Sequence, residues 1–230
     1  MELEVLPDKD AVAERAAEIL TGVGAGAHVA LSGGSTPKQA YALAGERRSD
    51  WSGVTLWLGD ERHVPASSDD SNARMVREEL LFHIPRATLP LFEPVDTEVD
   101  LDAAAADYER RLRAALGDGG RLDLALMGLG PDSHTASLFP GKPALAVTGR
   151  WAVGVPEPGL EPRVPRVTLT FEVFNAARDV VFVVAGEDKA EAMARAFADP
   201  PDRDAPAAHV RPSHGRLLVL ADRAAAAHLG

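Results

Sequence analysis

The residue pair best suited to proton transfer is Asp132 with His134, inside the segment Gly128–Gly141. An imidazole exchanges a proton near neutral pH, and a carboxylate two residues away is close enough to orient it or to balance its charge. The apolar run Leu122–Met127 comes directly before this segment and reads as a strand buried on both faces. Ligands of α/β folds bind at the carboxyl ends of parallel strands, so this segment is the predicted reaction centre.

A second segment, Ser32–Pro37 (SGGSTP), has the residue types of an anion-binding loop and follows the apolar segment His28–Leu31. Its two glycines allow backbone N–H groups to converge, its hydroxyl groups add donors, and its proline suits the first position of a helix. A helix N-terminus of this kind binds phosphate. The spacing is not that of a Walker loop, and an ordinary capped strand–helix turn is the other interpretation of the same residues.

Two lysines strengthen the phosphate interpretation. Lys189 lies in the first turn of a helix expected after the apolar run Val180–Ala185, where the helix dipole disfavours a cation. An anion between the ammonium group and the backbone N–H groups would remove that conflict. Lys38 shows the same pattern after the first glycine loop, so the two lysines together favour a phosphate site.

Asp60, Glu61 and Arg62 are three consecutive charges directly after the apolar run Val54–Leu58. Charges at the carboxyl end of a buried strand are unusual in a loop that only connects two elements. A solvated turn with a surface ion pair explains them equally well from the sequence alone.

Composition excludes several classes of protein. The chain has 230 residues and a formal charge of −11, which argues against a nucleic-acid partner. It has no cysteine, which fits a reducing cytoplasmic compartment and rules out a thiolate nucleophile. The start of the sequence lacks the basic and apolar regions of a signal peptide, and no apolar run approaches the roughly 18–20 residues that span a membrane. We therefore expect no membrane partner.

Apolar runs alternate with helical patterns along the whole sequence, which predicts a layered α/β fold with a mostly parallel sheet. We expect one domain over residues 1–230, because no linker is long enough to divide it. A helix should begin at Asp8, another should cover 101–116, and a last one should close the chain over Ala221–Leu229. The expected strands are Glu2–Leu6, His28–Leu31, Val54–Leu58, Leu89–Phe92, Leu122–Met127, Trp151–Val155, Arg166–Phe171, Val180–Ala185 and Leu217–Leu220.

Four segments resemble the 6-phosphogluconolactonase family, in that family's order and over nearly the whole chain. They are Ser32–Pro37, Gly59–Pro65, Gly128–Pro140 and Gly186–Ala190, of which the third is the most specific. The resemblance implies a modified doubly wound α/β fold, shared with glucosamine-6-phosphate deaminase. It also implies hydrolysis of 6-phosphoglucono-δ-lactone, a phosphorylated sugar lactone, in the oxidative pentose phosphate pathway, without a metal or other cofactor.

The resemblance also implies roles for individual residues. His134 would be the general base that activates water, Asp132 would orient it, and Arg62 would stabilise negative charge on the substrate or the developing oxyanion. The implied substrate- and phosphate-binding residues are Gly33, Gly34, Ser35, Asp60, Arg166 and Lys189. The family usually has glycine where this chain has Ser133, so a positive φ at that position would cost strain on the order of 1 kcal/mol.

Three other functions are compatible with parts of the pattern. A sugar-phosphate isomerase or deaminase, acting on glucosamine 6-phosphate, would use the same phosphate loop with Asp60 as its base. The sequence Thr135–Gly141 after the histidine favours the lactonase over this alternative. A serine hydrolase would need the G-x-S-x-G elbow, which is absent around Ser32. A non-catalytic sugar-phosphate sensor would normally lose His134 or Arg62, and both are present.

Overall fold

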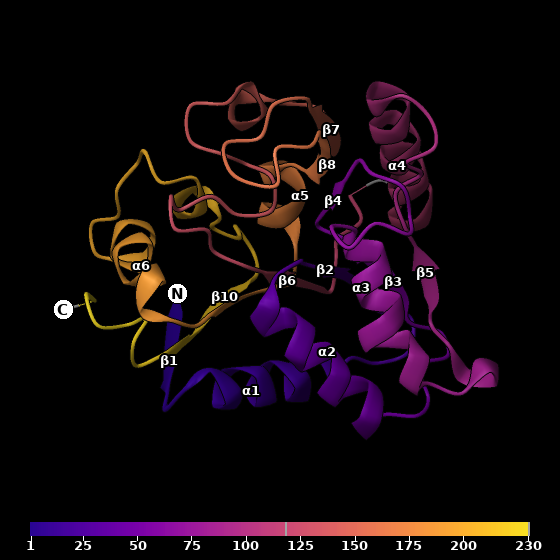
Figure 1. Cartoon of the computed structure of the whole chain (residues 1–230), viewed down its shortest axis with the longest axis horizontal. Helices are drawn as coiled ribbons and strands as arrows, with labels where there is room; N and C mark the ends of the chain where they lie inside the picture. The colour runs from indigo at the N-terminus through magenta and orange to yellow at the C-terminus, as the bar shows by residue number, and fades with distance from the viewer. Residues whose placement is uncertain (118, 230) are drawn as a thin grey trace.

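The central element of the computed structural model, which describes residues 1–117 and 119–229, is a parallel sheet of seven strands. Its order, β1-β10-β9-β6-β2-β3-β5, places β6 between β9 and β2 (Figure 1). All seven strands run in the same direction, so the predicted mostly parallel sheet is confirmed. The strands are β1 (Glu2–Leu6), β2 (His28–Leu31), β3 (Thr55–Leu58), β5 (Leu91–Glu93), β6 (Leu124–Met127), β9 (Asp179–Val184) and β10 (Arg216–Asp222).

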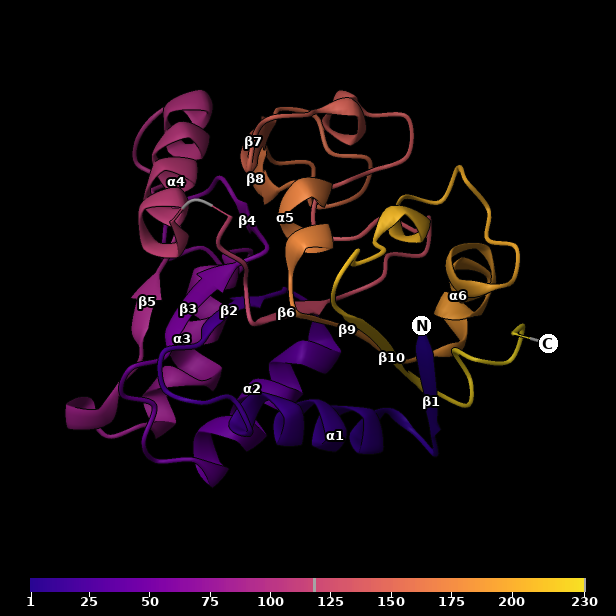
Figure 2. The ribbon, with the colours of Figure 1, turned by 180° about the vertical axis from the view of Figure 1, so that it is seen from behind.

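Helices cover both faces of this sheet (Figures 1 and 2). On one face lie α1 (Lys9–Thr21), α2 (Ser35–Arg47) and α3 (Asn72–Glu79), with one apolar cluster between them and the sheet. On the other face lie α4 (Leu101–Leu116), α5 (Phe171–Ala176) and α6 (Ala190–Phe197), with a second apolar cluster. Strand β6 is buried along its whole length between the two layers, which explains why its sequence is an unbroken apolar run.

A second, antiparallel sheet of three strands lies beside α4 and was not expected. It consists of β4 (Asp60–Arg62), β8 (Arg166–Leu169) and β7 (Ala152–Val155), with β8 in the middle. Strand β4 follows β3 after the single residue Gly59, so the chain passes directly from the large sheet into the small one. The charged triplet is therefore a strand and not a solvated turn. Its partner lies about a hundred residues away in the sequence, where no local pattern indicates it.

Two predicted elements in the C-terminal half of the chain are wrong. The predicted closing helix Ala221–Leu229 is absent, because β10 runs on to Asp222 and the chain then forms turns. Strand β1 accounts for this extension, since Val5 and Leu6 pair with Ala221 and Asp222. The short helix α5 replaces the end of the predicted strand Arg166–Phe171. None of the described helices is long and apolar enough to cross a membrane.

Candidate active site

A pocket of about 480 Å³ opens at the carboxyl ends of β2, β3, β6 and β9, where the sequence places its polar residues. The small sheet and the loop that contains Leu160 complete its wall. All the predicted site residues except Asp132 line the pocket directly. Asp132 lies outside the lining and contacts His134 through the ring nitrogen Nδ1. The lining includes Ser32, Gly33, Gly34, Ser35, Thr36, Asp60, Arg62, His134, Glu161, Arg166, Val183 and Lys189.

His134 and Asp132 form a close pair. His134 Nδ1 lies 2.5 Å from Asp132 Oδ1, and the same oxygen accepts the backbone N–H of His134 at 3.1 Å. Burial alone would raise the pKa of Asp132, but its hydrogen bond with the His134 ring and the charge of that ring outweigh this effect and lower the pKa. An ionised Asp132 therefore holds Nδ1, and Nε2 remains the ring nitrogen with a free lone pair.

The loop around this pair leaves no space behind the imidazole ring. A Cβ atom at Gly130 would lie 2.0 Å from His134 Nδ1, so only glycine fits there. The ring also packs on Phe139, with 4.4 Å between the ring centroids. Ser133 has φ 67° between the two functional residues, so this chain carries a serine in the backbone conformation that suits glycine best.

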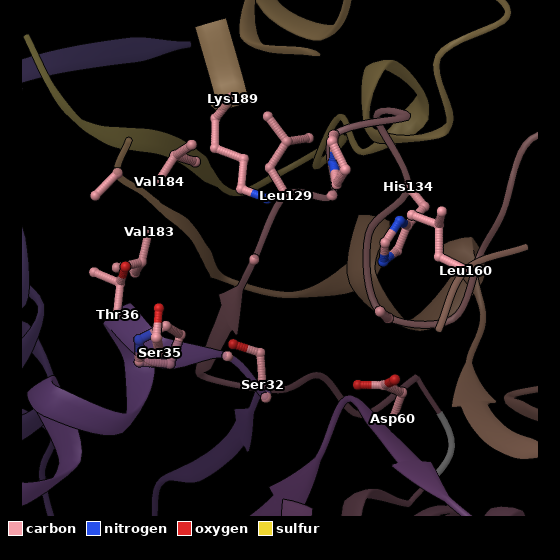
Figure 3. Close-up of a pocket in the computed structure, with 18 of the residues that line it drawn as sticks. Ser32, Ser35, Thr36, Asp60, Leu129, His134, Leu160, Val183, Val184 and Lys189 are labelled. Carbon is pink, nitrogen blue, oxygen red and sulfur yellow. The ribbon is translucent and has the colours of Figure 1, made fainter. Parts of the chain in front are cut away.

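The predicted anion-binding loop, Ser32–Pro37, leads from β2 into the first turn of α2. Gly34 has φ 112° and lies at the N-cap of α2, so the loop directs backbone N–H groups of the first turn to the pocket. Lys189 precedes α6 and extends into the pocket from the opposite side, facing Ser35 and Thr36 across it (Figure 3). These groups form a cationic, hydrogen-bond-donating end of the pocket that suits a phosphate.

Lys38 does not belong to this end of the pocket. Its ammonium group pairs with Glu79 of α3 at 3.0 Å, and the residue is absent from the pocket lining. The phosphate interpretation of Lys38 is therefore wrong, because a side chain on the neighbouring helix supplies the negative charge. For Lys189 the corresponding carboxylate is Asp188, its sequence neighbour, at 3.1 Å.

Asp60 lies at the opposite end of the pocket and is nearly buried (Figure 3). Its Oδ2 accepts a hydrogen bond of 2.6 Å from Ser137, and its backbone carbonyl accepts one of 2.8 Å from the Asn72 side chain. The Arg166 guanidinium is 3.9 Å from the same carboxylate. Asp60 is thus held by three side chains, two of which (Ser137 and Asn72) were not predicted to belong to the site.

Arg62 and Arg166 face each other across the ladder between β4 and β8. Arg62 donates to the backbone carbonyl of Asp70 at 2.6 Å, and Arg166 donates to that of Pro162 at 3.0 Å. Burial lowers the pKa of Arg166, Asp60 opposes that effect, and Arg62 adds to it. Among the described residues, the Nε atoms of both arginines are buried without a hydrogen-bond partner. Both residues line the pocket, so their positive charge can stabilise an anionic oxygen there.

Glu61, between these two residues of β4, is a buried carboxylate that joins the strand to α3. It accepts backbone N–H groups of Arg62 (2.7 Å), Asn72 (2.8 Å) and Ala73 (2.7 Å), and the Ser71 hydroxyl at 3.1 Å. Two of these donors belong to the first turn of α3, so a side chain from β4 caps that helix. The position of Arg62 in the pocket is fixed by the same contacts.

We expect Glu61→Gln to reduce the free energy of unfolding by about 1–3 kcal/mol, because an amide group turns a donor toward backbone N–H groups that need acceptors. Burial raises the pKa of Glu61 above the ordinary 4.5, against the effect of the backbone donors. At pH values between 4.5 and the raised pKa, the folded state therefore binds more protons than the unfolded state. The contribution of Glu61 to the free energy of unfolding falls as pH rises through that interval.

Urea unfolding of both proteins at a series of pH values measures this effect. The free energy of unfolding of the wild type minus that of Glu61→Gln should decrease as pH rises through the interval and should then become constant. A difference that increases with pH would mean that the folded state prefers the ionised form of Glu61.

Several residues in or beside the pocket could not be recognised from local sequence patterns. Leu160 and Glu161 come from a loop-rich segment without periodicity, and only the closure of that loop over the pocket brings them there. Ser137 stands inside the segment that the sequence marks as functional, but its partner Asp60 is 77 residues away. Asn72 is the first residue of α3 and is buried, although polar residues at a helix start are usually exposed, so its sequence does not indicate this contact.

Comparisons with known proteins agree with this geometry. A family model described as glucosamine-6-phosphate isomerases/6-phosphogluconolactonase matches residues 8–219. A 6-phosphogluconolactonase from Nostoc sp. is 38% identical over 241 aligned positions, which cover 99% of this chain and 98% of the relative. The structure of a 6-phosphogluconolactonase from Trypanosoma cruzi superposes with a TM-score of 0.87 at 29% identity, covering 99% of this chain and 96% of the other.

A monomeric glucosamine-6-phosphate deaminase has the same fold at lower sequence identity. Its structure superposes with a TM-score of 0.81 at 19% identity and covers 99% of this chain and 100% of its own. The predicted deaminase-like α/β fold is therefore confirmed.

Proposed function

The chain belongs to the family of glucosamine-6-phosphate isomerases and 6-phosphogluconolactonases, and from this membership we propose that it hydrolyses 6-phosphoglucono-δ-lactone to 6-phosphogluconate. The observation that carries the proposal is the pairing of His134 with Asp132 in the same pocket as the N-terminus of α2 and Lys189. One end of the pocket suits a phosphate, and the other holds a base.

In the proposed reaction, Nε2 of His134 takes a proton from water while the water oxygen attacks C1 of the lactone. Asp132 keeps the proton of the ring on Nδ1 and stabilises the imidazolium that forms. The tetrahedral intermediate then loses its bond between C1 and the ring oxygen, and His134 returns the proton to that oxygen. A lactone is an activated ester, so water and a positioned base are sufficient without a covalent intermediate.

Stabilisation of negative charge on the reacting oxygens is assigned to Arg62, which lines the pocket. A positive charge in a desolvated pocket stabilises a developing oxyanion more than it stabilises a neutral carbonyl. Asp60 cannot move freely toward a substrate, since Ser137 and Asn72 hold it. We assign it to orienting Arg166 and the substrate hydroxyl groups.

The phosphate is assigned to Gly33, Gly34, Ser35 and Lys189. Arg166, which lies beside Asp60 at the opposite end of the pocket, is assigned instead to a substrate oxygen at that end. Fixing the phosphate at one end places C1 of the bound lactone near the imidazole, which is where orientation contributes most to the rate. The proposed location is the cytoplasm, where phosphorylated sugars are metabolised. The absence of cysteine from the chain supports it.

Lys189→Ala should raise KM for the phosphorylated lactone by about tenfold or more, because it removes a flexible ammonium group at the phosphate end of the pocket. Steady-state kinetics on 6-phosphogluconolactone and on unphosphorylated gluconolactone measure this effect. KM for the unphosphorylated lactone should not change. Lys38→Ala is the matched control, since Lys38 pairs with Glu79 outside the pocket and its loss should change neither KM. An equal effect of Lys189→Ala on both lactones would contradict the assignment.

The function itself is tested by generating 6-phosphogluconolactone in situ and following its decay with and without the purified protein. Since the lactone also hydrolyses unaided, the rate must be proportional to protein concentration. Acceleration above the spontaneous rate is the expected result. Its absence would contradict the proposal, and deamination or isomerisation of glucosamine 6-phosphate would then be tested.

A further inference from the structure

The two tyrosines of the chain make the same unusual contact at two different places. The hydroxyl of Tyr41, on α2, donates to the backbone carbonyl of Ser32 at 2.8 Å and accepts the backbone N–H of Ser32 at 2.9 Å. The hydroxyl of Tyr108, on α4, donates to the carbonyl of Leu58 at 2.9 Å and accepts its N–H at 2.6 Å. Both tyrosines are completely buried.

Each contact lies at a point where the hydrogen-bonded ladder between two neighbouring strands ends. Strand β5 ends at Glu93, opposite Trp57 of β3, so no residue of β5 continues the ladder beside Leu58. Ser32 lies one residue beyond the last paired residue of β2, which is Leu31. A buried backbone N–H and C=O without partners would be costly at both points. A tyrosine hydroxyl offers one donor and one acceptor, so one oxygen atom replaces a neighbouring strand for the length of one residue.

The tyrosines are chemically suited to this function. Burial raises the pKa of both phenols, although their hydrogen bonds to the backbone act in the opposite direction. The hydroxyl groups therefore keep the proton that they must donate. Tyr108 is also held by an edge-to-face contact with Trp57, with 5.8 Å between ring centroids.

Ser32 and Leu58, whose backbone groups the tyrosines bind (the clamped residues), each stand directly before a functional segment that begins with glycine. Ser32 precedes Gly33 and Gly34 of the anion-binding loop, and Leu58 precedes Gly59, which leads to Asp60. Glycine imposes little conformation of its own, so the direction in which each segment leaves the sheet depends on the residue before it. The Ser32 hydroxyl points into the pocket, and its oxygen is buried without a partner in the described part of the chain (Figure 3).

We propose that Tyr41 and Tyr108 are positioning residues of the active site. Tyr41 fixes the start of the anion-binding loop, and Tyr108 fixes the start of the segment that carries Asp60 and Arg62. Neither tyrosine lines the pocket, so each acts through the backbone that it holds. The kinetic part of this inference rests on the proposed lactonase function.

Tyr41→Phe and Tyr108→Phe test the inference, and each variant is the matched control of the other. Each removes one buried oxygen and leaves one N–H and one C=O unpaired, so both should lower Tm by similar amounts. Tyr41→Phe should raise KM for 6-phosphogluconolactone about fivefold or more, with unchanged KM for unphosphorylated gluconolactone. Tyr108→Phe should lower kcat on both lactones about fivefold or more.

A fall in Tm in both variants with wild-type kcat and KM would overturn the inference, because the tyrosines would then only stabilise the fold. Identical kinetic changes in the two variants would overturn it as well, since no segment would be positioned separately.

Amide hydrogen exchange tests the two contacts without any substrate. In the wild type the N–H groups of Ser32 and Leu58 should exchange as slowly as those of the mid-strand residues Val29 and Leu56. Each Phe variant should accelerate exchange about tenfold or more at its own clamped residue only. Fast exchange in the wild type would overturn the inference. Slow exchange in a protein that does not hydrolyse the lactone would instead mean that the proposed function has failed and the contacts are real.

Discussion

His134→Ala should reduce turnover of 6-phosphogluconolactone by about 10²-fold or more, while the protein remains folded. The imidazole is the group in the pocket with a free nitrogen facing the cavity and an ionised partner, Asp132, behind it. Removing it leaves water to attack without a base, and general-base catalysis contributes about 10²–10⁴-fold to a rate. Decay of lactone generated in situ, corrected for spontaneous hydrolysis, measures the loss.

His214→Ala is a suitable control for this experiment, because His214 is exposed and lies outside the pocket. It should retain wild-type turnover. Binding of the product 6-phosphogluconate by His134→Ala, measured by calorimetry, should remain close to that of the wild type, since the phosphate groups of the site are untouched. Near-native turnover in His134→Ala would exclude this residue as the base.

Gly130→Ala should have an effect of similar size although it changes no reacting group. The added methyl would lie 2.0 Å from Nδ1 and 2.1 Å from Cε1 of His134, and 2.9 Å from Asp132 Oδ1. The imidazole must therefore move off its partner, and a displacement of about 1 Å can reduce a rate about 10²-fold. We expect kcat to fall by about that factor, with little change in KM.

Gly128→Ala gives a matched comparison in the same loop. A methyl at Gly128 would meet its nearest neighbour, the Gly33 carbonyl oxygen, at an ordinary contact distance of 3.7 Å. It should therefore cost much less activity than Gly130→Ala. Equal losses in the two variants would mean that this loop tolerates no side chain anywhere, and that the space behind His134 has no special importance.

Features that depend on local sequence patterns, such as the buried strands and the position of the pocket, could be predicted from the sequence. Buried runs such as Leu124–Met127 are apolar because both faces of the sheet are covered, so the strands and their parallel order could be expected. The pocket at their carboxyl ends follows from the same topology. His134 was predicted because its segment follows such a strand, and Lys189 because it is a cation in the first turn of the helix that follows another.

Interactions between distant segments could not be predicted in this way. The strand character of Asp60–Arg62 depends on β8, and the last strand extends to Asp222 because of β1 at the other end of the chain. Ser137 and Tyr108 are ordinary residues of a loop and a helix in the sequence. They make their contacts only when the fold brings Asp60 or Leu58, which are 77 and 50 residues away, within hydrogen-bond distance.

The bond between Ser137 and Asp60 has a consequence for the order of events in folding. It joins residues 77 positions apart, one from the segment after β3 and one from the segment after β6. Folding slows as contacts become less local, so a contact of this sequence separation forms later than the helices. While a ribosome synthesises the chain, the first half can build its helices, but the Asp60 carboxylate lacks the Ser137 hydroxyl until that residue has emerged and docked. Catalytic competence should therefore return later than helical content when the unfolded protein refolds.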